Sequence, residues 1–235
     1  MTDRELLIAD NYKRVLENIE AARLKSPGGS AVTLLGATKT VSQDDINFAA
    51  GLGLRIAGEN RVQEFTEKFD AVRPSLDEYH FIGHLQTNKA RLVVGKADLI
   101  HSVSSLRLAA ELDRQAKKFG VTQDVLLEIN CAAEESKSGF LPADAGHIID
   151  EFEAFSSLKL RGIMTMGPAG VEKDVLRKYF QETYAIFIDN FTKKSHNIRE
   201  TILSMGMSDS YELAIEEGAT LVRVGSAIFG HRFYG

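Results

Sequence analysis

Short runs of consecutive apolar residues recur along the chain, and stretches with helical spacing of apolar positions separate them. Within each run the apolar residues do not alternate with polar ones, which is the pattern of strands covered on both faces. The runs predict eight strands, at residues 32–37, 54–57, 79–82, 98–103, 124–129, 159–164, 201–205 and 220–224.

Helices are predicted before and between these strands. An amphipathic pattern over residues 2–25 places Leu6, Leu7, Val15, Leu16, Ile19 and Leu24 at roughly helical spacing. The further predicted helices are residues 44–52, 61–72, 88–95, 105–119, 142–155, 174–191 and 209–217.

Residues typical of helix ends support several of these boundaries. Ser42, Ser105 and Ser208 with Asp209 are placed as N-terminal caps. Gly53, Gly120 and Gly218 follow predicted helices, where a residue that tolerates positive φ is favoured.

About eight strand–helix alternations occur both in closed (β/α)8 barrels and in open doubly wound sheets. The count favours the barrel, and no dinucleotide fingerprint follows the first strand, since Gly28 and Gly29 precede it. No linker or change of composition marks a second domain. We therefore predict a single (β/α)8 TIM-type barrel domain over residues 1–235, with residues 1–25 as an extra helix packed on it.

Composition narrows the classes of partner and compartment. The net charge is −5, which argues against nucleic acid or an anionic membrane as partner because both favour a clustered basic face. The first residues, MTDRELLIAD, do not resemble a secretory leader, and no apolar run approaches the roughly 18–20 residues that cross a bilayer. The single cysteine, Cys131, excludes an internal disulfide. We expect a soluble cytoplasmic protein.

Lys39 stands just beyond the first predicted strand, in the segment GATKT. In a (β/α)8 barrel the carboxyl ends of the strands form the active face. One interpretation is a lysine whose ammonium extends to the surface. The other is a lysine that attacks a carbonyl to form a Schiff base, favoured if apolar walls around it promote the neutral amine.

Two later segments contain residues suited to binding a phosphate. SMGMSDS places Ser204, Ser208 and Ser210 around a glycine, and RVGSAIFG places Gly225 and Ser226 directly after the last strand. Loops after strands seven and eight of such barrels frequently bind phosphate. Taken singly, Ser208 could simply cap a helix and Gly225 simply form a turn. Together with Lys39 they point to an aldehyde that carries a phosphate, and pyridoxal 5′-phosphate (PLP) is the economical candidate. A cofactor-free aldolase acting on a sugar phosphate stays open as another hypothesis.

The whole chain resembles the pyridoxal phosphate homeostasis protein family. The resemblance lies in GATKT, GENRVQE, HFIGHLQTNK, IHSVSS, LEIN, KSGF, LRGIMTMG and LSMGMSDSYELAIEEGATLVRVGSAIFG, in this order. It implies the barrel domain of alanine racemase, an internal aldimine on Lys39, and phosphate contacts from Ser208 and from the backbone of Gly225 and Ser226. It also implies Arg223 beside the pyridine nitrogen and Asn60 near the ring. Ser204 and Met164 complete the predicted cofactor site, Met164 or Met166 being where a ring could pack.

Arg223 bears on catalysis. A permanent cation beside the pyridine nitrogen disfavours its protonation, so PLP there is a weaker electron sink. Racemisation also needs an acid–base group on the opposite face. Alanine racemase takes a tyrosine from a further domain for this, whereas here only Tyr234 follows, and the chain ends about ten residues beyond the last strand.

We therefore expect a PLP-binding protein that holds the cofactor on Lys39 and releases or transfers it, with little or no catalysis of its own. The resemblance supplies the role in PLP homeostasis. The expected partners are PLP and PLP-accepting apoenzymes, and a monomer is favoured. A PLP-dependent amino-acid racemase of low activity is the alternative.

The remaining candidates carry weaker hypotheses. His80 and His84 in HFIGH lie four apart on a predicted strand, which favours packing over a metal site, and no metal is expected. Cys131 is expected to be an inert buried thiol. Residues 137–140 are expected to form a loop over the barrel mouth.

Overall fold

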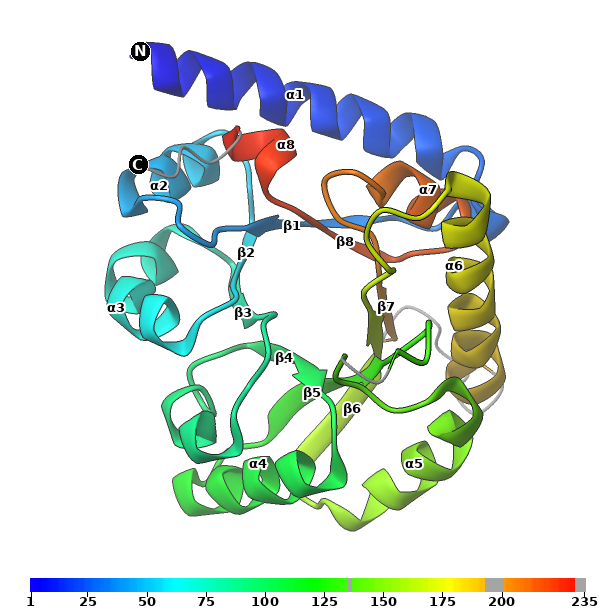
Figure 1. Ribbon diagram of the computed structural model, residues 1–235. Coiled ribbons are helices and arrows are strands. Elements are labelled where there is room, and N and C mark those ends of the chain that lie inside the picture. Colours follow the sequence, from blue (N-terminus) through cyan, green and yellow to red (C-terminus); the bar gives the residue numbers. More distant parts are fainter. Residues whose placement is uncertain (135–136, 193–200, 231–235) are drawn as a thin grey trace.

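The computed structural model describes residues 1–134, 137–192 and 201–230. Within these residues eight parallel strands close into a barrel in the order β1 to β8, and β8 pairs with β1 (Figure 1). The strands are β1 (Thr33–Ala37), β2 (Ile56–Glu59), β3 (Glu78–Phe81), β4 (Leu99–Val103), β5 (Gln123–Ile129), β6 (Leu158–Thr165), β7 (Ile202–Ser204) and β8 (Leu221–Val224). Each predicted strand coincides with one of them to within two residues at either end. The predicted (β/α)8 barrel is confirmed.

Helices surround the barrel and one precedes it. The α-helices are α1 (Asp3–Arg23), α2 (Gln43–Gly51), α3 (Val62–Val72), α4 (Leu106–Phe119), α5 (Ala145–Glu151), α6 (Lys173–Phe187), α7 (Tyr211–Glu216) and α8 (Ser226–Phe229). Short 3₁₀ turns occur at η1 (Pro27–Gly29), η2 (Arg73–Ser75), η3 (Thr87–Leu92), η4 (Pro142–Asp144) and η5 (Phe152–Ala154), and a π-helical turn, η6 (Ile188–Thr192), extends α6.

Three predictions about helices need correction. The expected helix at residues 88–95 is the 3₁₀ turn η3, and the expected helix at 142–155 is divided into η4, α5 and η5. The short helix α8 was not predicted, because four residues are too few to show a helical period. The caps at Ser42 and Ser105 are confirmed, since their hydroxyls accept from the N–H groups of Asp45 and Leu108 at 3.1 and 3.2 Å.

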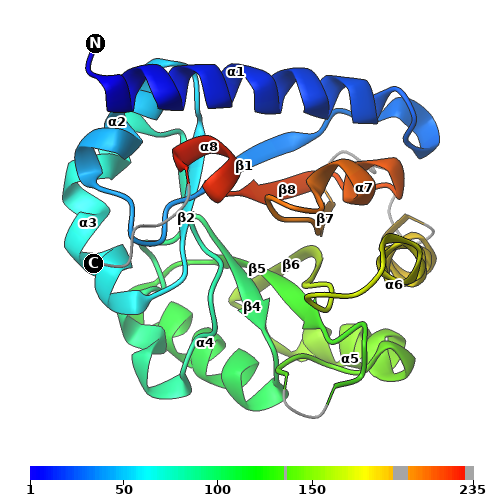
Figure 2. The same ribbon diagram turned by 45° about the horizontal axis from the view of Figure 1, so that its top comes forward.

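Helix α1 lies across α2, α7 and α8 at one side of the barrel (Figures 1 and 2). Its buried apolar face consists of Ile8, Tyr12, Val15, Ile19 and Ala22, which follow one another at intervals of three and four residues. Of the six apolar residues predicted for this face only Val15 and Ile19 are buried, whereas the four leucines are largely exposed. The Asn11 side chain donates to the carbonyl of Ile228 at 3.0 Å and so fixes α1 against α8.

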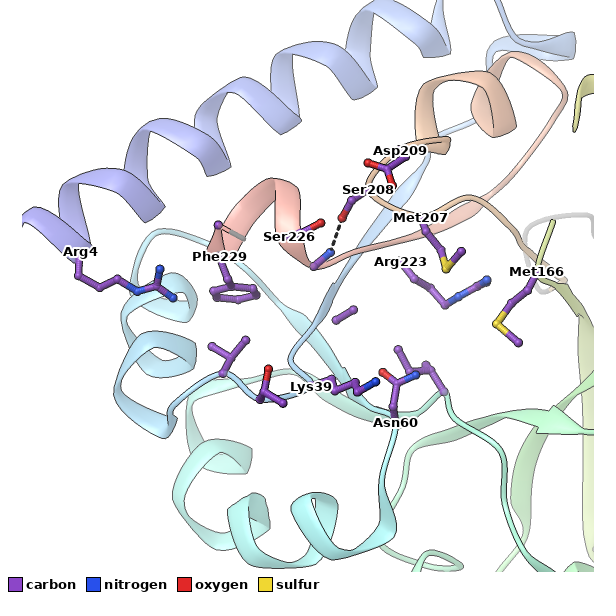
Figure 3. A pocket seen from close by; sticks show the side chains of 16 residues that line it. Arg4, Lys39, Asn60, Met166, Met207, Ser208, Asp209, Arg223, Ser226 and Phe229 are labelled. Carbon is purple, nitrogen blue, oxygen red and sulfur yellow. Dashed lines mark hydrogen bonds between the residues drawn. The ribbon is translucent and has the colours of Figure 1, made fainter. Parts of the chain in front are cut away.

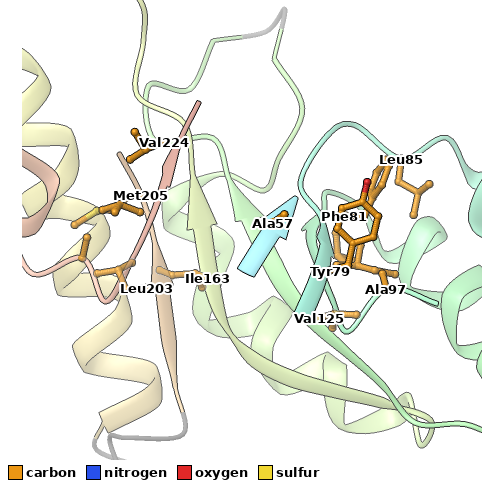
Figure 4. Packing of buried hydrophobic residues seen from close by; sticks show 14 of the residues in the cluster. Ala57, Tyr79, Phe81, Leu85, Ala97, Val125, Ile163, Leu203, Met205 and Val224 are labelled. Carbon is orange, nitrogen blue, oxygen red and sulfur yellow. The ribbon is translucent and has the colours of Figure 1, made fainter. Parts of the chain in front are cut away.

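The main apolar core fills the layer between the strands and the helices. Figure 4 shows two parts of it, one around Tyr79 and Phe81 and one around Leu203 and Met205. The Tyr79 ring stacks on Phe65 of α3 with centroids 4.8 Å apart. Strands whose outward residues pack against helices in this way leave alternate residues pointing into the barrel.

The barrel interior contains both apolar and polar side chains. Two small apolar clusters form there, Leu35 with Ile82 and Leu221, and Leu99 with Leu126 and Met164. Buried polar residues on the same strands are His80, His101, Glu128, Ser204 and Arg223. A polar interior in a barrel of this size needs internal hydrogen bonds, which is where the functional analysis begins.

No helix in the described part of the chain combines the length and the apolar character needed to cross a membrane.

Candidate functional site

A pocket of about 600 Å³ opens at the carboxyl ends of the strands (Figure 3). Its lining comes from loops after β1, β2, β3, β6, β7 and β8, together with residues of α1 and α8. The lining residues are Arg4, Ala37, Lys39, Thr40, Val41, Asn60, Ile82, Met166, Met207, Ser208, Asp209, Arg223, Gly225, Ser226, Phe229 and Gly230. Of the eight predicted site residues, six meet here: Lys39, Asn60, Ser208, Arg223, Gly225 and Ser226.

Lys39 lies two residues beyond β1 and is half-buried in the pocket wall. Its side chain extends across the pocket toward Asn60 (Figure 3). The ammonium makes no hydrogen bond or ion pair with any residue of the described ranges, although other lysines nearby do. The Lys39 amine is therefore available to a ligand in the pocket.

Ser208 joins the two loops that were predicted to bind a phosphate. Its hydroxyl oxygen accepts from the N–H groups of Gly225 at 3.1 Å and Ala227 at 3.2 Å, which leaves the hydroxyl proton free to donate. The prediction that Ser208 caps the helix after the seventh strand is wrong, because α7 begins after Ser210. Ser208 acts on α8 instead, a contact between segments 17 residues apart or more.

Backbone donors line the same end of the pocket. Among the described residues, the N–H groups of Ser208, Asp209 and Ser226 donate to no protein acceptor. The N–H of Gly225, which was expected to contact a ligand, is taken by Ser208. Gly225 has a steric role as well, since a Cβ atom there would lie 2.9 Å from the carbonyl oxygen of Ala37. The Asp209 carboxylate lies at the outer side of this end, beyond Ser208 as seen from Lys39 (Figure 3).

Arg223 forms part of the pocket wall and is otherwise enclosed in the barrel, with 4% of its surface exposed. Its Nη1 donates to the Ser204 hydroxyl at 2.5 Å and its Nη2 to the carbonyl of Thr165 at 2.9 Å. Burial lowers the pKa of Arg223 to about 10, and Glu128 opposes this shift. The guanidinium is thus a fixed cation at neutral pH.

A chain of hydrogen bonds continues from Arg223 through the barrel. Ser204 Oγ lies 3.1 Å from His101 Nδ1, His101 Nε2 lies 3.0 Å from His80 Nδ1, and His80 Nε2 lies 2.6 Å from the Glu78 carboxylate. We call these five residues the Arg223 chain. Arginine can only donate, so Ser204 uses its own proton on His101 Nδ1, and both imidazoles then carry their proton on Nε2. Every donor in the chain therefore points away from the pocket.

Burial affects the protonation of His101 in this chain and of Glu128, which interacts with Arg223. The pKa of His101 lies well below its usual value because the ring is fully buried, and electrostatic interactions with the neighbouring His80 ring and the Arg223 cation add to the effect. His101 is therefore neutral. Burial raises the pKa of Glu128, whose Oε2 has no partner among the described residues, while Arg223 acts in the opposite direction.

Ser204 and Met164 do not reach the pocket, so their predicted cofactor contacts need correction. Both side chains have no exposed surface. Ser204 lies below the pocket between Arg223 and His101, and Met164 packs on Leu99 and Leu126 in the interior. Alternate residues of a strand share a face, so Met164 and Met166 both point inward, and only Met166, beyond the end of β6, lines the pocket.

Sequence analysis missed several lining residues. Arg4 comes from the first turn of α1 and is held by Asp45 of α2, with Nε and Nη2 at 3.0 and 2.9 Å from one carboxylate oxygen. Phe229 comes from the unpredicted helix α8. No local signal could have placed α1 beside the barrel mouth. Thr40 and Val41 adjoin Lys39 and could have been included on that ground.

The histidines of HFIGH, Cys131 and the 137–140 segment, which carried the weaker hypotheses, all make contacts within the protein. His84 Nδ1 lies 3.2 Å from the Ser138 hydroxyl, and His80 belongs to the Arg223 chain. No group of three or more potential metal ligands occurs among the residues that the structure describes. Cys131 is buried, which raises the pKa of its thiol, and Sγ lies 3.7 Å from the Met166 carbonyl oxygen. Phe140, at the end of the 137–140 segment, pairs with β5 through Glu128 and Asn130. Tyr234 lies outside the described residues.

Comparison with known proteins identifies the family of the chain. Residues 11–233 match the family model described as alanine racemase, N-terminal domain. The pyridoxal phosphate homeostasis protein of Aquifex aeolicus is 39% identical over 96% of this chain and 98% of its own length. That of Escherichia coli K12 is 36% identical, with 97% of each chain covered.

Solved structures show the same barrel. The structure of PipY from Synechococcus elongatus with PLP bound has a TM-score of 0.79 and 32% identity, covering 95% of this chain and all of PipY. Alanine racemase from Clostridium difficile has a TM-score of 0.71 at 18% identity, covering 95% of this chain and 60% of the racemase, a likeness in fold alone. From the match along nearly its whole length, the chain belongs to the pyridoxal phosphate homeostasis protein family.

Proposed function

We propose that this protein binds PLP through Lys39 and acts in PLP homeostasis by holding the cofactor and handing it on. The observation that carries the proposal is the Lys39 ammonium, which has no partner in the described structure and lies in one pocket with free backbone donors. In a phosphorylated aldehyde, the aldehyde suits the amine of Lys39 and the phosphate suits the free backbone donors of the same pocket. The family membership of the chain and the PLP-bound relative support the same ligand.

The residues present fit PLP in size and in polarity. The volume of about 600 Å³ exceeds that of one such molecule, and Ile82, Met166 and Met207 supply apolar surface for a ring. The Ser208 hydroxyl and the N–H groups of Ser208, Asp209 and Ser226 would hold the phosphate, because uncommitted donors suit an anion. Gly225 contributes by allowing β8 to approach β1 closely. Asn60 would contact the ring from the opposite side.

Bound PLP supplies an aldehyde that condenses reversibly with a primary amine, with loss of one water, to give a Schiff base. Lys39 presents that amine. Arg223 fixes a positive charge in the wall where the ring would lie, and this charge opposes protonation of a neighbouring basic nitrogen. A ring nitrogen kept neutral makes the cofactor a weak electron sink, which suits storage more than catalysis.

Transfer of the cofactor to an acceptor requires that the amine of the acceptor can enter the pocket. Met166 and Met207 in its wall are 40% and 42% exposed, so an incoming amine can approach from solvent. We propose that PLP-accepting apoenzymes are the partners, and that the protein acts in the cytoplasm as a monomer. We further propose that it has little or no catalytic activity of its own.

The experiment compares wild type with Lys39→Ala after incubation with PLP. We expect an absorption band near that of a protonated imine for wild type alone, and a borohydride-reduced adduct that mass spectrometry locates at Lys39. Ser208→Ala should retain the adduct at saturating PLP but bind more weakly. An adduct on another lysine, or PLP binding of equal strength by Lys39→Ala, would overturn the proposal.

A second arm separates this function from the racemase of low activity and from the aldolase. Exchange of the α-proton of alanine with deuterated solvent at enzymatic turnover would favour the racemase. Cleavage of a sugar phosphate by cofactor-free protein, abolished in Lys39→Ala, would favour the aldolase. We expect neither.

A further inference from the structure

The backbone on the strand side of Lys39 is held by groups from β2 and α3. Thr38 is fully buried, and its hydroxyl donates to Glu59 Oε1 at 2.8 Å. The Thr38 N–H donates to the carbonyl of Gly58 at 2.9 Å, and Lys68 Nζ donates to the carbonyl of Thr38 at 3.0 Å. All polar groups of the residue before Lys39 are thus engaged.

The backbone on the other side of Lys39 is held as well, and in an unusual conformation. Thr40 has a φ of 63°, a left-handed value that is rare for a β-branched residue. Its N–H donates to Glu64 Oε2 at 2.7 Å. A conformation that threonine disfavours persists only where the surroundings enforce it, and among the described residues this hydrogen bond is the one that reaches Thr40 from another element.

Glu59, Glu64 and Lys68, which we call the Lys39 cluster, are tied to one another. Lys68 Nζ lies 2.7 Å from Glu59 and 3.0 Å from Glu64, and the three side chains are 12%, 0% and 17% exposed for Lys68, Glu59 and Glu64. Burial raises the pKa of Glu59 against the opposing effects of Lys68 and Thr38. Burial would also raise the pKa of Glu64, but the Thr40 N–H and the Lys68 ammonium outweigh it and hold that pKa below its usual value.

None of the three cluster residues lines the pocket, so they act on a ligand only through neighbouring residues, and the hydrogen bonds described above lead to the backbone on either side of Lys39. The cluster grips the residues before and after Lys39 and leaves the ammonium itself without a partner. If the segment were mobile, the amine would occupy many positions. Because a reacting group held in the right position forms its bond much more readily, such mobility would weaken bond formation.

We propose that Glu59, Glu64 and Lys68 position Lys39 for bond formation with the carbonyl carbon of its ligand. The inference rests on the proposed function. In the step concerned, Lys39 Nζ forms a C=N bond to the aldehyde carbon, and the carbonyl oxygen leaves as water with two protons from the amine. The cluster takes no part in the proton transfers and acts on the position of the amine alone.

The test uses two ligands that differ in one group. PLP has the aldehyde, and pyridoxine 5′-phosphate has an alcohol in its place with the same ring and phosphate. Glu64→Ala removes the acceptor of the Thr40 N–H, and Glu67→Ala removes an exposed carboxylate of the same helix as a matched control. Dissociation constants are measured for both ligands on the purified full chain.

We expect Glu64→Ala to raise the dissociation constant for PLP by about tenfold, because a less accurately placed amine forms its bond less favourably. The dissociation constant for pyridoxine 5′-phosphate, which forms no such bond, should change less than about twofold. Glu67→Ala should change neither. Glu64→Gln keeps an acceptor oxygen without the charge, and it should bind PLP as wild type does.

Equal weakening for both ligands would show a general loss of pocket structure and overturn the inference, as would unchanged PLP binding in Glu64→Ala. A Glu64→Gln variant as weak as Glu64→Ala would assign the effect to charge and also overturn it. Failure of the proposed function has a different signature, since wild type and Lys39→Ala would then bind PLP equally. If Glu64→Ala does not fold, the double variant Lys68→Met with Glu64→Gln is tested instead, because it frees the Thr38 carbonyl without leaving two carboxylates unpaired. The same pair of ligands is used, with the same expected discrimination.

Discussion

Two of the three cationic side chains that line the pocket, Arg223 and Lys39, are held in opposite ways. Arg223 is held through its own side chain, since Nη1 donates to the Ser204 hydroxyl and Nη2 donates to the Thr165 carbonyl. Lys39 is held through its neighbours in the chain, by the Lys39 cluster, and its ammonium has no partner among the residues that the structure describes. A group that provides a constant charge gains from being fixed, whereas an amine with the bond-forming role proposed for Lys39 has to keep its own atoms free.

The two supporting groups also differ in charge. The Lys39 cluster places one ammonium between two carboxylates, so removing one partner exposes an uncompensated charge. The two inner links of the Arg223 chain, Ser204–His101 and His101–His80, join neutral groups, so breaking one of them leaves an unpaired dipole. The comparison predicts a graded series of effects on stability.

Lys68→Met should have the largest effect. Its removal leaves Glu59 and Glu64 facing each other in a poorly solvated site, which should cost about 3–5 kcal/mol of unfolding free energy at neutral pH. Urea unfolding measures the loss. Without Lys68 the folded-state pKa values of both carboxyls rise above the unfolded ones, so stability is retained at low pH and lost as pH rises.

The deficit of Lys68→Met should accordingly shrink as the pH is lowered toward about 4, where both carboxyls take up protons. Adding Glu64→Gln to Lys68→Met should recover part of the loss at neutral pH. A deficit that does not depend on pH would assign the effect to packing and contradict the ionic account.

Ser204→Ala should have the intermediate effect. It leaves Arg223 Nη1 without an acceptor and His101 Nδ1 without a donor in the barrel interior, which should cost about 1–3 kcal/mol. The measurement is again urea unfolding, with Ser156→Ala, an exposed serine, as the control. If both variants unfold at the wild-type midpoint, the Arg223 chain contributes nothing to stability.

His101→Gln should change the pH dependence more than the stability itself. Burial lowers the folded-state pKa of His101, so the unfolded state binds more protons and stability falls as pH drops below the unfolded pKa. Wild type should lose about 1 kcal/mol from this residue between about pH 6.5 and 5.5, a loss that glutamine cannot show. Parallel profiles for the two proteins over this interval would mean that His101 is protonated in the folded state.

Features that depend on neighbouring positions were predictable from the sequence. The eight strands follow from local apolar runs, and the caps at Ser42 and Ser105 follow from residues three positions apart. Lys39, Ser208 and Gly225 could be placed at the pocket because all strand ends of a parallel barrel meet at one face. The choice between Met164 and Met166 could not be made, since it depends on the depth at which β6 ends.

Apolar periodicity and the positions of strand ends thus determined the barrel and the side on which the pocket opens. Only the tertiary structure decided which polar groups meet. Ser204 and His101 are 103 residues apart, and Thr40 and Glu64 are 24 apart on different elements. The cap of α8 by Ser208 and the place of Arg4 at the pocket are decided in the same way. A hydrogen bond depends on distances of a few ångströms between elements, and the packing of the whole barrel sets those distances, whereas a strand depends on the residues within it.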